Sequence, residues 1–143
     1  MIDLTAVYKL VWDKLNEPKK LSCDIYDYVP YGELNFPYAY LGGFYTKEDN
    51  TKNTEGISCE LYINIISAYR GRKEILELMN QVNNIMAQDI NSKEYTVFIK
   101  QGRHAIELKK DEVGWGKNDN NAFFHAVLVF DIDIKIKKNN NNQ

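Results

Sequence analysis

The clearest pattern in the chain is Ile57-Ser58-Cys59-Glu60-Leu61-Tyr62-Ile63-Asn64-Ile65, in which apolar and polar residues alternate. A β-strand points successive side chains to opposite faces, so the apolar residues of this run share one face. The pattern therefore predicts a strand over residues 57–69 with one face buried in a core. The glycine and arginines at 70–72 end it.

Two more strands are predicted in the second half of the chain. The segment 122–137 carries apolar residues at every second position: Phe124, Ala126, Leu128, Phe130, Ile132, Ile134 and Ile136. The segment 94–101 also alternates, and it continues through 104–108 after a break at Gly102. A polar loop, 111–121, separates the two predicted strands.

The first half of the chain predicts a short strand at 23–29, which Pro30 ends, and a longer one at 36–47. The pair Gly42-Gly43 interrupts the longer strand and predicts a bulge or a close backbone approach. The segment 48–55 is entirely polar, so we expect it to form the tip of a long hairpin.

Helical spacing of apolar residues appears in two places. Residues 3–15 carry a stripe that begins behind the capping residue Asp3: Val7, Leu10, Val11 and Leu15. Residues 73–89 carry a second stripe: Ile75, Leu78, Met79, Val82, Ile85 and Met86.

The predicted order is therefore helix, three strands, helix, two strands. This order favours an α+β two-layer sandwich, with a mostly antiparallel sheet of about five strands and two helices. We expect one domain over residues 1–137. The tail 138–143 is polar and of low complexity, so we expect it to be disordered.

Composition excludes several classes of protein. The chain has 143 residues, 44% of them apolar and 27% charged, which is ordinary for a soluble globular protein. The formal net charge is −2, so there is no basic excess of the kind that nucleic-acid binding needs. No long apolar run predicts a membrane span, and the first residues do not resemble a signal peptide.

The sequence offers little for metal or nucleophilic chemistry. His104, His125, Cys23 and Cys59 are not spaced as the ligands of a metal site, and we expect both cysteines to be free thiols. Cys59 lies on the apolar face of its strand, which predicts a buried and unreactive thiol. Each histidine is interpreted as a solvated or hydrogen-bonded strand residue.

The charged residues have equally simple interpretations. Asp131 and Asp133 alternate with core residues, which is typical of the solvated face of a strand, although paired carboxylates can also act in acid–base catalysis. Arg70, Arg72 and Lys73 could meet a phosphate or carboxylate, but three basic residues at a junction are more often solvated. We therefore predict no enzyme, no catalytic residues, no metal and no cofactor.

Two features favour a binding surface, while the tyrosine content is ambiguous. Tyrosine is enriched at interfaces, but the ten tyrosines are more simply interpreted as half-buried strand residues. Trp115 stands between two glycines, where it can be a lid on the sheet or an anchor for a partner. The hairpin tip has no apolar residue, so we expect the strand ends beside it to contact a neighbouring molecule. The candidate interface residues are Tyr45, Thr46, Lys47, Glu48, Asp49, Gly56, Ile57, Ser58 and Trp115.

Several short strings, in this order, resemble the tail completion (tail terminator) proteins of long-tailed bacteriophages. They are Tyr26-Asp27-Tyr28-Val29-Pro30, Phe36-Pro37-Tyr38, Leu41-Gly42, Gly71-Arg72-Lys73-Glu74 and Ala126-Val127-Leu128-Val129-Phe130. The resemblance covers roughly residues 1–137. The polar loop with Trp115 and the asparagine tail are not part of the family pattern.

The resemblance implies a ring, commonly a hexamer, that caps the head-proximal end of the tail tube, stops tube polymerisation and offers a surface for head joining. It implies no enzymatic activity and no cofactor. The implied partners are further copies of the chain, the tail tube protein and a head-completion or connector protein, and DNA passes through the ring without specific binding. The implied location is the virion, with host cytoplasm before assembly and no membrane.

Other readings remain open on the sequence. The chain can be a different head–tail connector (neck) subunit. It can also be a small intracellular ligand-binding domain or an enzyme that uses the concave face of the sheet. Neighbouring genes for a tail tube and a connector would separate these readings.

Overall fold

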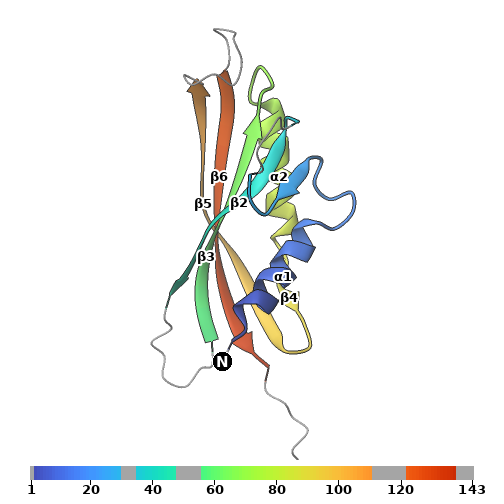
Figure 1. Cartoon of the computed structure of the whole chain (residues 1–143), viewed down its shortest axis with the longest axis vertical. Helices are drawn as coiled ribbons and strands as arrows, with labels where there is room; N and C mark the ends of the chain where they lie inside the picture. The colour runs from blue at the N-terminus through green and yellow to red at the C-terminus, as the bar shows by residue number, and fades with distance from the viewer. Residues whose placement is uncertain (1, 30–34, 48–55, 111–121, 138–143) are drawn as a thin grey trace, which may run out of the picture.

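The computed structural model describes residues 2–29, 35–47, 56–110 and 122–137. In this part of the chain the elements are α1 (Leu4–Leu15), β1 (Asp24–Tyr26), β2 (Tyr38–Lys47), β3 (Gly56–Ser67), α2 (Lys73–Ile85), β4 (Ile90–Asn91), β5 (Tyr95–Lys110) and β6 (Ala122–Ile136). The fold is α+β: two helices lie on one side of a strongly twisted sheet (Figure 1).

The sheet has the strand order β1-β2-β3-β6-β5-β4. Its two central strands, β3 and β6, pair antiparallel along their length, from Gly56 opposite Lys135 to Ser67 opposite Phe124. β6 also pairs antiparallel with β5 from one end to the other. The alternating segments that predict strands in the sequence are therefore the middle of the sheet.

Two predicted features of the sheet are wrong. The sheet is mixed and has six strands, whereas a mostly antiparallel sheet of about five was expected. β1 pairs parallel with β2, with Asp24 opposite Tyr38, and a pairing between two segments of the chain is not encoded in the alternation of either. The additional strand, β4, follows α2 and changes the predicted order; with two residues it is too short to show a pattern.

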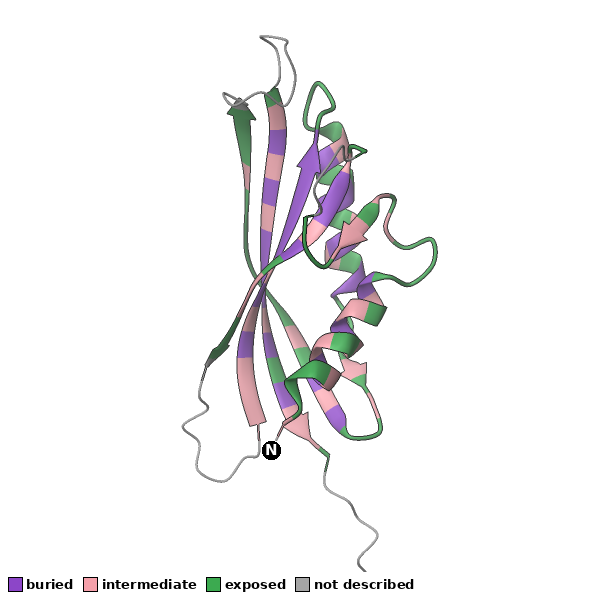
Figure 2. Cartoon of the chain, in the orientation of Figure 1, coloured by how far each residue is buried: buried purple, intermediate pink, exposed green. Residues whose placement is uncertain are grey.

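The core lies between the helices and one face of the sheet. On this face Cys59, Leu61, Ile63 and Ile65 of β3 are buried, as the alternation predicts. The same face of β6 contributes the predicted series, buried from Phe124 to Ile134 at every second residue. Figure 2 shows the purple of buried residues running along the middle strands and the inner sides of both helices.

Both helices begin where the sequence indicates. The Asp3 carboxylate accepts hydrogen bonds from the backbone N–H groups of Thr5 and Ala6, at 3.0 and 3.3 Å, and so caps α1. Gly71, with a φ of 127°, adopts a turn conformation that other residues rarely accept, directly before α2. α2 ends at Ile85 rather than at residue 89.

The glycines inside two strands mark irregular pairing. The register of β2 with β3 shifts between Leu41 and Phe44, so the bulge predicted from Gly42-Gly43 is confirmed. The register of β5 with β6 shifts between Gln101 and His104, and β5 runs through this irregularity as one long strand.

Candidate interaction surface

The face of the sheet away from the helices is rich in tyrosine. Residues opposite one another in the register share a face, and this places five tyrosines there: Tyr26, Tyr38, Tyr40, Tyr45 and Tyr62. Tyr38 is the centre of an aromatic cluster, with its ring 6.2 Å from that of Tyr26, 5.5 Å from Phe36 and 6.3 Å from Tyr40. Tyr38 is 2% exposed whereas Phe36 is 40% exposed, so the cluster has a buried centre and an exposed rim.

A second group, further along β2, combines rings with charge. The rings of Tyr45 and Tyr62 meet edge to face at 5.4 Å. The Arg103 guanidinium donates to the Tyr62 hydroxyl at 2.9 Å and lies 3.8 Å from the Glu60 carboxylate. The group connects β2, β3 and the irregular part of β5, and Tyr45 and Arg103 are both largely exposed.

A polar pair lies on the same face. His125 Nε2 donates to Asn64 Oδ1 at 2.8 Å, and Asn64 is 8% exposed. A Cβ added at Gly42 would stand 2.5 Å from Asn64 Nδ2, so the glycine makes room for the amide. Burial is the main cause that lowers the pKa of His125, and Lys109 adds to this effect, while Glu107 raises the pKa. The interpretation of His125 as a hydrogen-bonded strand histidine is confirmed.

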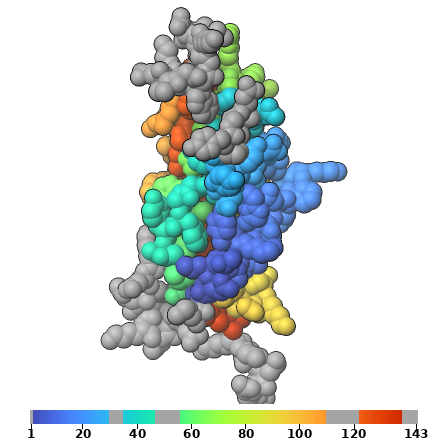
Figure 3. Space-filling view, viewed as in Figure 1, coloured from blue at the N-terminus to red at the C-terminus, as the bar shows by residue number. Residues whose placement is uncertain are grey.

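The predicted interface residues fall at one end of this surface where the structure describes them. Tyr45, Thr46 and Lys47 end β2, and Gly56, Ile57 and Ser58 begin β3, with Lys47 opposite Ser58. The Ser58 hydroxyl donates to Asp133 Oδ1 at 2.6 Å, so one of the two β6 carboxylates already has a partner. Figure 3 shows the end of β2 (teal) on the surface beside α1 (dark blue). Glu48, Asp49 and Trp115 lie outside the described residues.

Sequence reasoning missed Glu60, Tyr62 and Arg103 as part of this surface. The alternation in 57–65 places Glu60 and Tyr62 on the face opposite the apolar residues, but it does not indicate which residue of another strand lies beside them. The signal for Arg103 was its place directly after Gly102, at the irregularity where β5 crosses the level of Tyr62.

The edges of the sheet are only partly covered. β1 pairs with β2 at Tyr38–Tyr40, and no other described strand pairs with β2 beyond this point, from Leu41 to Lys47, on the side away from β3. β4 pairs with β5 at Thr96 and Val97, and no described strand follows it along the rest of β5. Each edge strand therefore presents a length of backbone without a partner strand in the described structure.

The described residues show no group of metal ligands and no activated thiol. Among them, no three His, Cys, Asp or Glu side chains are grouped as metal ligands would be. Both cysteines are free, and burial raises the pKa of Cys23 to about 12 and that of Cys59 to about 11, so both thiols are protonated at neutral pH. Neither described helix is long and apolar enough to cross a membrane.

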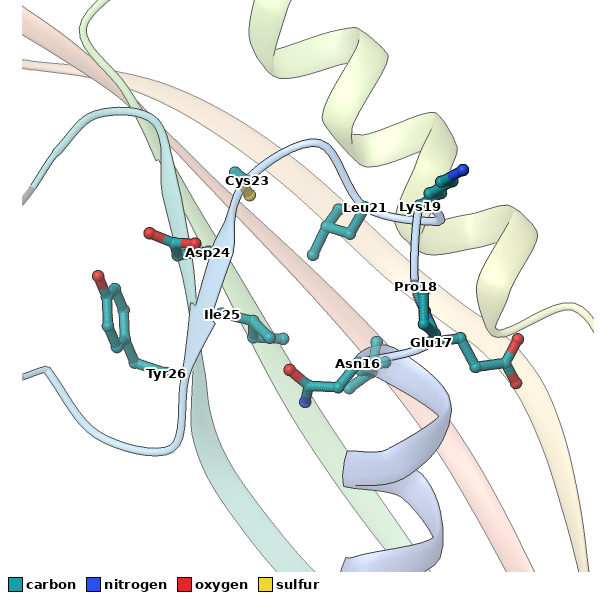
Figure 4. A pocket seen from close by; sticks show the side chains of 10 residues that line it. Asn16, Glu17, Pro18, Lys19, Leu21, Cys23, Asp24, Ile25 and Tyr26 are labelled. Atoms are coloured by element: carbon teal, nitrogen blue, oxygen red, sulfur yellow. The ribbon is translucent and has the colours of Figure 1, made fainter.

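A hollow of about 360 Å³ lies between the end of α1 and β1 (Figure 4). The segment from Asn16 to Leu21 forms one wall, and Cys23, Asp24 and Tyr26 form another. Its one cysteine, Cys23, is protonated at neutral pH, and no histidine lines the hollow to act as a base. We therefore interpret the hollow as a surface depression and not as a reaction site.

Comparison with known proteins shows the fold. A chain from the structure titled "Virion of native gene transfer agent (GTA) particle" superimposes with a TM-score of 0.61. The two chains are 15% identical, and the match covers 89% of this chain and 92% of that chain. No protein-family model and no curated protein sequence matches the chain.

Proposed function

We propose that this chain is a structural subunit of a phage-like particle and acts as its tail terminator. Several copies form a ring, which we expect to be a hexamer, at the head-proximal end of the tail tube. The ring stops tube polymerisation and provides the surface that joins the head. The protein works in the virion, after a period in the host cytoplasm before assembly.

The observation that carries the proposal is the shared fold with a chain of a gene transfer agent virion. The match runs through nearly the whole of both chains, so it concerns the complete arrangement of helices and strands and not a single motif. The strings that resemble tail completion proteins are the support for the specific role.

Two features of the surface support the proposal that the protein assembles with other molecules. Tyr45 and Phe98 are 58% and 46% exposed on the side of the sheet without helices, and interfaces favour such rings. The partly covered strand edges are a second place where another molecule can add. We propose the tail tube protein and a head-completion protein as further partners, with DNA passing through the ring unbound.

Tail length tests the proposal directly. The gene is deleted from its genome, and the particles are measured by negative-stain electron microscopy, with the intact gene supplied in trans as the control. We expect tubes of uncontrolled length and unjoined heads in the deletion strain, and normal tails on complementation. Tails of normal length that lack heads would instead indicate a connector subunit, and unaffected particles would overturn the structural role.

A further inference from the structure

Two strands, β2 and β5, each have a stretch that no described strand pairs with on its outer side, and these stretches lie at opposite edges of the sheet. On β2 the uncovered length is Leu41–Lys47, and on β5 it is Phe98–Lys110. From Gln101 to Ala105 every residue of β5 is exposed, and Leu108 is 59% exposed. Figure 2 shows this part of β5 in green, in contrast to the purple of the central strands.

The backbone of β5 is oriented to accept a further strand. The Ile99 N–H donates to Asp89 Oδ1 at 2.9 Å, so it points away from β6. In an antiparallel pair every second residue points its backbone groups away from the partner. Ile99 lies opposite Ile132 of β6. The same holds at every second residue of β6 from Phe130 back to Phe124, whose partners on β5 are Gln101, His104, Ile106 and Leu108. The N–H and C=O groups of these four residues therefore point outward.

The same reasoning applies to β2. The even-numbered residues of β6 point their backbone N–H and C=O groups toward β3. The β3 residues opposite them are odd-numbered and point their backbone groups toward β6. The β3 residues that face β2 are then even-numbered, and their partners include Tyr40, Tyr45 and Lys47. The residues between these, including Phe44 and Thr46, direct their backbone groups to the free edge.

The two edges match in direction. β2 is antiparallel to β3, β3 to β6, and β6 to β5, so β5 runs opposite to β2. A rotation about an axis along the strands brings the β5 edge of one copy beside the β2 edge of the next, antiparallel. Because the contact is made by two different surfaces, repeating it gives a closed ring when the rotation closes.

We propose that the ring closes by strand pairing between copies: the outer edge of β5 near Gln101 and His104 binds the outer edge of β2 near Phe44 and Leu41 of the next copy, which lie at the same levels of the sheet. This inference rests on the proposed ring and names the surfaces that form it. β1 and β4 cover the other parts of the two edges, so they limit how far one strand can slide along the other.

Proline at position 104 is the sharpest test. His104 is exposed, and His104→Pro removes an outward N–H while leaving the bonds to β6 in place. The matched control, His104→Ala, keeps the N–H. Each variant is compared with the wild type by sedimentation equilibrium over a range of concentrations and by rescue of tail length in the deletion strain, with circular dichroism as the check on folding.

We expect His104→Ala to behave as the wild type, and His104→Pro to fold but to assemble at least about tenfold more weakly and to fail in rescue. Normal rescue by His104→Pro would overturn edge pairing and leave the terminator role intact. Loss of rescue in both variants with normal folding would show that the histidine side chain matters, which also contradicts the proposal. Failure of the wild-type gene to affect tail length would count against the proposed function itself.

Disulfide trapping gives an independent measurement that does not depend on a proline. Thr46→Cys is combined in one chain with a cysteine at Ile99 or at Gln101, which lie at the level of Thr46 and Phe44 in the sheet, and assembled particles are oxidised. Two strands separate β2 from β5 within one copy, so these thiols are too far apart to bond internally. We expect a ladder of linked copies for at least one pair and none for Thr46→Cys with Leu76→Cys on α2. The absence of a ladder in every pair would overturn the proposal.

Discussion

At the scale of single residues, the contact between His125 and Asn64 has a measurable consequence. We expect His125→Leu to lower the free energy of unfolding by about 1–2 kcal/mol at pH 7.5, because leucine has no hydrogen-bond donor for the buried Asn64 oxygen. His104→Leu, at an exposed position of β5, is the control and should change it by less than about 0.5 kcal/mol. Urea denaturation measures both, and equal effects would contradict the role given to Asn64.

The same histidine makes stability depend on pH. Its folded-state pKa lies below the ordinary 6.5, so the folded protein resists a proton that the unfolded chain accepts. The wild type should therefore lose stability as pH falls below about 6.5, relative to the His125→Leu variant, which cannot take up that proton. The stability difference between the two should be larger at pH 7.5 than at pH 5; a difference that grows on acidification would show that the folded protein favours the charged imidazole.

The two thiols are a second test at this scale. With pKa values of about 12 and 11, Cys23 and Cys59 form almost no thiolate at pH 8 in the folded protein. We expect a thiol reagent to label both slowly under native conditions and rapidly in urea, where the pKa returns to about 8.5. Rapid native labelling of Cys23 would show that the hollow between α1 and β1 is a reactive site.

At the scale of elements, the connection between β2 and β3 can be shortened. Replacing residues 48–55 with Asn-Gly leaves four residues between Lys47 and Ser58, which are opposite one another, and this is a common hairpin length. Loop-closure entropy depends weakly on length, so we expect the unfolding free energy to change by less than about 1 kcal/mol. Assembly should weaken if the segment contacts a neighbour. Normal tail length with the shortened chain would show that residues 48–55 are not needed for capping.

The local sequence pattern predicts which face of a strand is buried, but it does not predict which strands pair. The faces of β3 and β6 follow directly from alternation, and Gly42-Gly43 and Gly102 mark the irregular positions of β2 and β5 in the sequence. The parallel pairing of β1 depends on its contact with Tyr38–Tyr40 of β2, and β4 is a strand because Ile90 pairs with Val97 of β5. Neither is a local property. The group of Tyr45, Tyr62 and Arg103 could not be predicted for the same reason: its members come together through the order of strands in the sheet.

At the scale of the whole molecule, the proposed ring makes a prediction about salt. Strand pairing uses backbone hydrogen bonds, which are not screened as surface ion pairs are. We expect the association constant to change less than about fivefold between about 50 and 500 mM salt. A loss of association of more than about a hundredfold would show that charges such as Lys100 and Glu107 hold the copies together instead.

The position of β6 has a consequence for the newly made chain. β6 is the last described strand to be synthesised, yet it is the strand that joins the β1-β2-β3 half of the sheet to the β5-β4 half. Until β6 is synthesised, β3 and β5 have no common neighbouring strand. We expect ribosome-bound chains that end before residue 122 to be cut rapidly by protease, and chains extended by a linker that carries residues 122–136 out of the exit tunnel to resist it. The last described strand to be synthesised would then be the one that joins the two halves of the sheet.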